Sequence, residues 1–267
     1  MSIDLSKALD RCIYCRLSGV PLTLEHVIPQ GLGGTLKLER ATCYDCMKQI
    51  QSFEPFCITK TFEVSRTFFK VKSKKKHKFK GRNLPVGIGE AADKKWVQAD
   101  FDTYPFAMGV PVFPPATLLQ GIVKETSEIV ISHLRTWFSA EYLARIKKFA
   151  GQGKASTFTL FETERFSRFM AKIAHGFAVS ELGLDGFTPI ATNFIRAIPD
   201  PLSFSLVGEA IEPISKAQPN LHEMDIQYVR DLVTVRVQLF APITGAPTYQ
   251  VVVGKRLPEL PAPDQGA

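Results

Sequence analysis

The clearest apolar periodicity in this chain lies between residues 164 and 182. Apolar side chains recur there at helical spacing, at Phe166, Phe169, Met170, Ile173 and Phe177, before a stop signal at Gly183. The pattern predicts a helix over residues 164–182. A polar set follows the same spacing along another side, at Glu164, Arg168, Lys172 and His175. Two interpretations of this polar side stay open: an ordinary solvated face with ion pairs, which is favoured, and a face that contacts phosphate.

Alternation of apolar and polar residues predicts strands near the C-terminal end. Residues 228–240 alternate in their core, a turn follows around Gly245, and residues 249–253 are mostly apolar, which together predict a β-hairpin. Shorter patterns predict a helix over 139–150, strands over 155–161 and 203–209, and a short helix over 188–198. Residues 118–135 favour strands, and residues 60–71 fit either a strand or a helix.

Two Cys-x-x-Cys pairs dominate the N-terminal segment, with 27 residues between them. One such pair places two thiolates on a tight turn, and two pairs complete the tetrahedral Cys₄ set of a structural zinc site. The expected zinc ligands are Cys12, Cys15, Cys43 and Cys46. Disulfides are disfavoured because nothing in the sequence indicates an oxidising compartment, and a redox pair is disfavoured because no βαβ pattern accompanies it.

The residues between the two pairs predict a hairpin and a helix. Residues 23–28 alternate as a strand that ends at Pro29, and the glycine-rich loop 31–34 can turn the chain back. A helix should follow from Tyr44 to about Phe53, with an apolar face of Met47, Ile50 and Phe53. Knuckle, hairpin and helix in this order make a treble-clef arrangement.

These motifs resemble those of a known family. Cys-Ile-Tyr-Cys15, Glu-His-Val-Ile-Pro29, Gly-Leu-Gly-Gly34 and Ala-Thr-Cys-Tyr-Asp-Cys46 are similar, in this order, to motifs of the zinc-stapled HNH endonucleases of ββα-metal type. Weaker similarity follows at residues 172–177 and 181–183. The resemblance implies an endonuclease that hydrolyses phosphodiester bonds, with His26 as general base and Glu25 as a ligand of catalytic Mg²⁺ or Mn²⁺. A neutral imidazole can take a proton from water, and a hard cation can neutralise charge on phosphate.

Three features complicate this site. Glu25 and His26 are adjacent, so they can share a site only if their strand is bent or bulged. Arg40 stands where the family usually has Asn, and Met47 where it has Asn or His. Arg40 cannot accept a hydrogen bond and the Met47 sulfur suits Mg²⁺ poorly, so Asp45 or backbone carbonyl groups would have to substitute.

Two alternatives to the endonuclease therefore stay open. The first is a catalytically inactive, zinc-stabilised nucleic-acid-binding protein derived from an HNH nuclease. The second is a zinc module that serves protein contact only.

Positive charge gathers next to the cysteine motifs. The net charge is +7, and residues 1–83 hold 16 Lys and Arg against 7 Asp and Glu. The densest run comprises Lys70, Lys72, Lys74, Lys75, Lys76, Lys78, Lys80 and Arg82. Such a local excess suits a phosphate backbone and predicts a nucleic acid, foremost DNA, as the partner. A solvated linker is the alternative interpretation of this run.

The expected organisation is α+β in two main parts. A zinc-binding HNH-like module occupies residues 1–60, a basic connecting segment 61–83, a mixed α+β domain of unassigned role 84–257, and a frayed tail 258–267. The sequence shows no signal peptide and no membrane-spanning run, so no membrane contact is expected. The five cysteines suit a reducing cytoplasm, and Cys57 should be a buried apolar residue rather than a reactive thiol.

Overall fold

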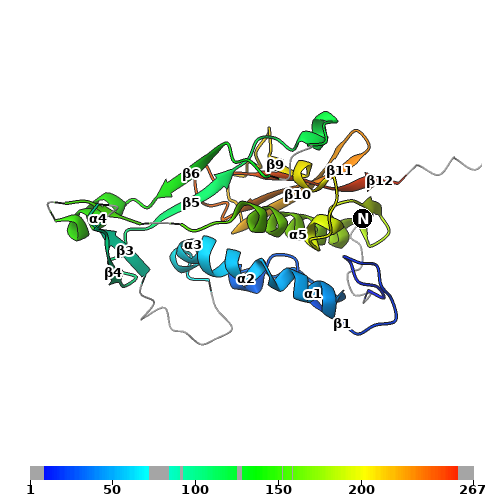
Figure 1. Cartoon of the computed structure of the whole chain (residues 1–267), viewed down its shortest axis with the longest axis horizontal. Coiled ribbons are helices and arrows are strands. Elements are labelled where there is room, and N and C mark those ends of the chain that lie inside the picture. The colour runs from blue at the N-terminus through cyan, green and yellow to red at the C-terminus, as the bar shows by residue number, and fades with distance from the viewer. Residues whose placement is uncertain are drawn as a thin grey trace, which may run out of the picture.

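The computed structural model describes residues 9–71, 84–90, 93–124, 128–151, 153–157 and 159–257. It shows a mixed α+β protein with several sheets, as the sequence predicts. Figure 1 shows the largest sheet above the long helix α5 (Thr163–Leu182), and below α5 a row of α1 (Tyr44–Gln51), α2 (Glu54–Phe56) and α3 (Glu63–Phe68). Over the described ranges, no helix is long and apolar enough to cross a membrane.

The largest sheet is built from the C-terminal strands. The strands β10 (His222–Val229), β11 (Leu232–Leu239) and β12 (Tyr249–Arg256) pair antiparallel in this order, and β8 (Phe187–Pro189) and β9 (Val207–Glu209) pair with the far side of β12. The predicted hairpin around Gly245 is confirmed as β11 and β12. The strand expected over 228–240 is confirmed as β11 but begins too early, because the chain turns at Arg230, whose φ is +58°, and residues 228–229 belong to β10.

Helix α5 confirms the predicted helix and lies between two layers. Its apolar side packs on β11 and β12, where the rings of Phe166 and Tyr249 are 5.3 Å apart. The opposite side is not solvated: Arg168, Lys172 and His175 are 7%, 1% and 0% exposed. The favoured interpretation of a solvated face is therefore wrong, because the N-terminal hairpin and helices cover this polar side of the helix.

The N-terminal part is a hairpin followed by short helices. Strand β1 (Leu22–His26) pairs antiparallel with β2 (Lys37–Cys43), and α1 begins directly after β2. The connecting loop depends on its glycines: Gly33 has a φ of +90°, and a Cβ atom on Gly34 would lie 1.9 Å from the Ile28 carbonyl oxygen. Residues 60–71, which fit either a strand or a helix by sequence, are helical in the structure, with a π-helical turn at Cys57–Thr61 before α3.

The remaining elements lie between these two parts of the sequence. They are β3 (Leu84–Ile88), β4 (Lys95–Ala99), β5 (Ala107–Val112), β6 (His133–Phe138), α4 (Tyr142–Ala150), β7 (Ala155–Ser156) and α6 (Thr192–Ile195), with 3₁₀ turns at Gln30–Leu32, Thr117–Gln120 and Ser203–Ser205. The predicted helix at 139–150 is confirmed as α4. Of the strands expected at 118–135, 155–161 and 203–209, the structure forms only β6, β7 and β9, each of which covers a small part of the expected range.

One buried apolar core joins residues from both ends of the described chain. It includes Cys12 and Ile13 near the N-terminal end, α5 in the middle, and Val253 on β12. Cys57 is fully buried, as expected, and burial raises the pKa of its thiol. The proposed boundaries at residues 60, 83 and 257 stay predictions, and the frayed tail 258–267 lies outside the described residues.

Candidate metal centre and the carboxylate pocket

The first Cys-x-x-Cys pair lies on a tight loop, Cys12–Cys15. The N–H of Cys12 donates to the carbonyl oxygen of Leu17, and the N–H of Arg16 donates to that of Cys12, both at 2.9 Å. Arg16 takes a positive φ of 62° to complete the turn. The N–H of Ile13 donates to the carbonyl oxygen of Ala41 at 2.8 Å, so the loop is joined to β2.

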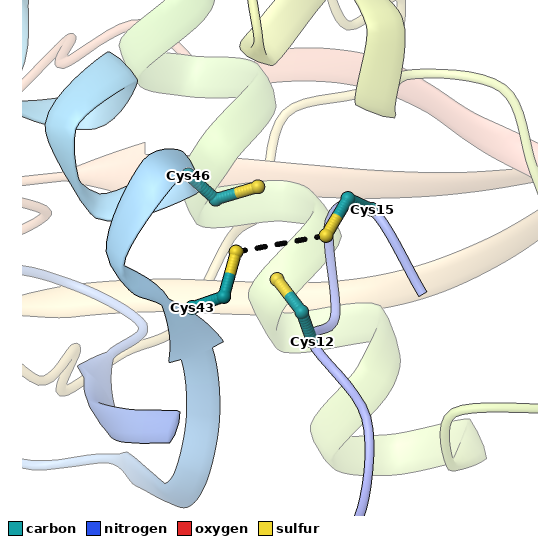
Figure 2. Close-up of side chains that lie close together, drawn as sticks. All are labelled: Cys12, Cys15, Cys43 and Cys46. Carbon is teal, nitrogen blue, oxygen red and sulfur yellow. Dashed lines mark hydrogen bonds between the residues drawn. The ribbon is translucent and has the colours of Figure 1, made fainter. Parts of the chain in front are cut away.

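The second pair lies where β2 passes into α1. Cys43 is the last residue of β2, and Cys46 lies in the first turn of α1. Figure 2 shows the four side chains converging, two from the loop and two from the junction of strand and helix. All four Sγ atoms lie within 4.8 Å of one another, and those of Cys15 and Cys43 are 3.6 Å apart. We call these four residues the cysteine cluster.

The geometry of the cysteine cluster fits a zinc ion. Four sulfur atoms held about 2.3 Å from one ion lie about 3.8 Å from each other. A disulfide bond would need about 2.05 Å, so the 3.6 Å separation of the Cys15 and Cys43 sulfur atoms is that of free thiols. Within the described residues, these four cysteines form the one group of three or more His, Cys, Asp or Glu side chains close enough to hold a metal ion.

The surroundings of the cysteine cluster favour the thiolate, the form that binds zinc, at Cys12, whereas burial raises the pKa of Cys15 and the hydrogen bond to Cys12 raises that of Cys46. Three of its members are buried, and Cys15 is partly exposed. The Cys46 thiol and nearby backbone N–H groups, including that of Cys43, donate hydrogen bonds to Cys12 and lower its pKa to about 4 although burial opposes this. The cysteine cluster could therefore hold a structural zinc ion with no open coordination position.

A pocket of about 360 Å³ lies between β1 and α1. Its lining includes Glu25, His26, Met47, Glu54 and Lys172, and we call it the carboxylate pocket. The structure therefore brings together the three residues that the HNH resemblance places at the catalytic site, the predicted pair on β1 and Met47 on α1. Neither Arg40 nor Asp45 is among the described residues that line the carboxylate pocket.

The β1–β2 hairpin contains a bulge next to Glu25 and His26, at the position where these two residues require one in order to share a site. Thr23 pairs with Thr42, but Glu25 pairs with Leu38, so one residue of β1 faces three residues of β2. Such a bulge breaks the regular alternation of side chains and re-aims them. Two adjacent residues can therefore line one pocket, which a regular strand would not permit.

The ammonium group of Lys172 reaches this pocket from α5. Its Nζ atom lies 2.6 Å from Oε1 of Glu25 and 3.1 Å from Oε2 of Glu54, and it also donates to the carbonyl oxygen of His26. The side chain of Lys172 is 1% exposed and that of Glu25 is 9% exposed. Burial alone would lower the pKa of Lys172, but the charges and hydrogen bonds of Glu25 and Glu54 raise it overall.

The second oxygen of Glu25 is also engaged, because Oγ1 of Thr42 donates to Oε2 at 2.7 Å. The carboxylate thus has protein partners on both oxygens, and its charge is neutralised by Lys172. The other family position holds Met47, a soft sulfur that Mg²⁺ disfavours. A catalytic Mg²⁺ or Mn²⁺ ion therefore does not fit the carboxylate pocket with Lys172 in this position.

Of the eight predicted nucleic-acid-binding residues, Lys70 is the one that falls within the described residues. Lys72, Lys74, Lys75, Lys76, Lys78, Lys80 and Arg82 lie outside the described residues. Lys70 is exposed, and its Nζ atom lies 5.6 Å from the ring centroid of Phe101. Closer to the carboxylate pocket, Lys37, which pairs with His26 across the hairpin, and Lys48, which follows Met47 on α1, are also exposed.

Sequence reasoning assigned Lys172 and His175 to a solvated side of their helix. It missed that both residues bind the N-terminal part and so hold α5 against it. Nε2 of His175 lies 2.8 Å from the carbonyl oxygen of Ile13, in the loop of the first cysteine pair. Burial lowers the pKa of His175 to about 4, so the neutral ring donates this bond. A signal was available: Ala171, Ala174, Gly176 and Ala178 leave α5 apolar or small on most sides, which is typical of a buried helix.

Comparisons with protein families, with curated proteins and with solved structures find no match to this chain. The chemistry of the cysteine cluster and of the carboxylate pocket therefore has to be argued from their own geometry.

Proposed function

We propose that this chain binds nucleic acid through a zinc-stabilised module of HNH type, without metal-dependent cleavage at its carboxylate pocket. One observation carries this choice: the carboxylate expected to bind the catalytic ion is instead paired with Lys172 at 2.6 Å. The resemblance alone would favour an endonuclease. With both Glu25 oxygens bound inside the protein and an ammonium group beside them, a divalent ion would have to displace Lys172 to reach this carboxylate, whereas the cysteine cluster could still hold a structural zinc ion.

The distribution of charge supports nucleic acid as the partner. Exposed cations, Lys37, Arg40 and Lys48, lie on the hairpin and on α1, and the basic run follows in the sequence. Tyr44, at the start of α1, is 64% exposed and could stack on an unpaired base. Backbone contacts by Lys and Arg release counterions, so binding of this kind weakens as salt rises.

The binding proposal is tested by fluorescence anisotropy with labelled single-stranded and duplex DNA and with RNA, between 50 and 200 mM salt. We expect a steep fall in affinity with salt, and a slope that becomes shallower by about 0.7–0.9 for each phosphate contact removed. The variant Lys74→Gln/Lys75→Gln/Lys76→Gln should weaken binding. A matched control, Lys147→Gln/Lys148→Gln on α4, should not. Absence of salt-dependent binding to every probe would favour the protein-contact alternative.

An active HNH endonuclease remains the second candidate, because the bulge in β1 brings Glu25 and His26 to one pocket. Nicking of supercoiled plasmid by zinc-loaded protein with Mg²⁺ or Mn²⁺, beside His26→Ala, separates the two candidates. We expect the plasmid to be bound and left intact by both proteins. Cleavage by the wild type and none by His26→Ala would overturn the binding-only proposal and establish His26 as the base.

A further inference from the structure

Four oxygen atoms surround the ammonium group of Lys172. They are Oε1 of Glu25 at 2.6 Å, Oε2 of Glu54 at 3.1 Å, the carbonyl oxygen of His26, and the carbonyl oxygen of Val27 at 3.3 Å. An ammonium group has three N–H donors and no acceptor. Glu25, Glu54 and His26 take all three donors, so Lys172 has none left for a phosphate group. We call these four oxygen atoms the oxygen cage.

The oxygen cage has the composition of a cation site. Carboxylate and backbone carbonyl oxygens are the ligands that hard divalent cations take in proteins. Mg²⁺ needs oxygen atoms at about 2.0–2.1 Å, and Ca²⁺ accepts them at about 2.3–2.6 Å. The oxygen atoms of Glu25, Glu54 and Val27 lie 2.6–3.3 Å from the Lys172 nitrogen, and these distances are closer to those of the larger ion.

The position of the cage explains why a lysine can fill it. Lys172 stands on α5, and the oxygen atoms come from β1, from the residue after it and from α2, elements that belong to the opposite layer. The side chain crosses this layer boundary and is 1% exposed. A positive charge at this point joins the two layers and neutralises Glu25, as a bound ion would.

We infer that the carboxylate pocket is a divalent-cation site in which the ammonium group of Lys172 performs the role of the ion. Shortening this side chain should convert the pocket into a binding site for Ca²⁺, and more weakly for Mn²⁺ or Mg²⁺. The inference concerns the occupant of the pocket and holds whether or not the chain binds nucleic acid.

The test compares Lys172→Ala with Lys172→Met in the zinc-loaded full chain. Alanine leaves space within the cage, whereas methionine removes the charge and keeps most of the bulk. Titration calorimetry and thermal melting are followed with CaCl₂, MnCl₂ and MgCl₂. We expect Lys172→Ala to bind one Ca²⁺ and to gain about 5–10 °C in Tm at 100 times its Kd, whereas the wild type and Lys172→Met gain nothing.

The site is assigned by a further substitution, since Lys172→Ala/Glu25→Gln should lose the Ca²⁺ response. A folded Lys172→Ala that binds none of the three ions would overturn the inference. If Lys172→Ala does not fold, melting of Lys172→Met and Lys172→Met/Glu25→Gln decides. Recovery of Tm in the double variant would support charge neutralisation as the role of Lys172, and a further loss would overturn it.

Discussion

The cysteine cluster and the carboxylate pocket both use the β1–β2 hairpin and α1, yet they bring charged groups together in opposite ways. The cysteine cluster brings four thiol groups within 4.8 Å of one another, and the main influences on the pKa values of Cys12, Cys15 and Cys46 are burial, hydrogen bonds and the neighbouring cysteines rather than a Lys or Arg charge. The carboxylate pocket brings Glu25 and Glu54 together with Lys172 between them. The first arrangement calls for a metal ion, whereas the second already contains its positive charge.

This difference shows how a metal site can be distinguished from a group of anionic side chains that a protein cation already neutralises. Proximity of ligand atoms is not enough, because both regions place anionic groups close together. What separates them is whether another part of the chain supplies the compensating charge, since an uncompensated buried charge costs several kcal/mol. The cysteine cluster should therefore depend on an added ion, and the carboxylate pocket on α5.

The largest effect should follow from loss of the cysteine cluster. Structural zinc contributes about 10–16 kcal/mol in small zinc modules, as much as the whole stability of a domain. Cys46→Ser should therefore lose zinc and unfold the N-terminal part, as measured by zinc content and far-ultraviolet circular dichroism. Cys57→Ala is the matched control and should keep one zinc ion per chain. An unchanged melting curve of zinc-free Cys46→Ser would contradict the prediction.

A smaller loss should follow from removal of one pocket carboxylate. Glu25→Gln leaves buried Lys172 with Glu54 as its remaining carboxylate partner, and should cost about 3 kcal/mol in the free energy of unfolding. Glu54→Gln removes the charge of a side chain that is 24% exposed, and should cost about 1 kcal/mol. Urea unfolding measures both. Equal losses would mean that the two carboxylates share the charge of Lys172 equally.

A small gain in the free energy of unfolding should follow from relief of backbone strain in the bulge of the β1–β2 hairpin. Arg40 has a φ of +51°, which favours glycine, so Arg40→Gly should raise the free energy of unfolding by about 1 kcal/mol. Arg230→Gly, at the turn between β10 and β11, relieves similar strain far along the chain and should give a similar gain. A loss in Arg40→Gly alone would show that the Arg40 side chain supports the hairpin.

The smallest effect concerns pH. The pKa of Lys172 is raised in the folded protein, so its contribution is complete below the unfolded value of about 10.4 and is lost only above the folded value. The Tm difference between the wild type and Lys172→Met should therefore stay constant from pH 6.5 to 9.5. A difference that shrinks within this range would indicate a lowered pKa. The cysteine cluster should behave otherwise, because acid protonates its thiolates and releases zinc.

The cysteine cluster could be predicted from the sequence because its information is local. Each pair fixes two ligands on one turn, and only one further contact, between loop and hairpin, is needed to join them. The helix that carries Cys46 was predicted for the same reason, from the spacing of Met47 and Ile50. The bulge could be stated only as a requirement, since the two extra residues on β2 follow from pairing rather than from composition.

The occupant of the carboxylate pocket could not be predicted in this way. Lys172 is 146 residues from His26, and periodicity placed it on a solvated side of its helix. Helical spacing shows which residues share a face but not which layer will cover that face. The turn at Arg230 was missed for a related reason, because alternation continues across two paired strands as if they were one.

The separation of Lys172 from the hairpin also sets an order of events during synthesis. At about 5–20 residues per second, α5 leaves the ribosome roughly 7–30 s after Glu25 and His26. Cys12 and Cys15 emerge before this interval and Cys43 and Cys46 early within it, so zinc can be captured by a nascent chain whose carboxylates still lack their lysine. Until α5 arrives, β1 and α2 offer Glu25 and Glu54 to any divalent ion in their surroundings.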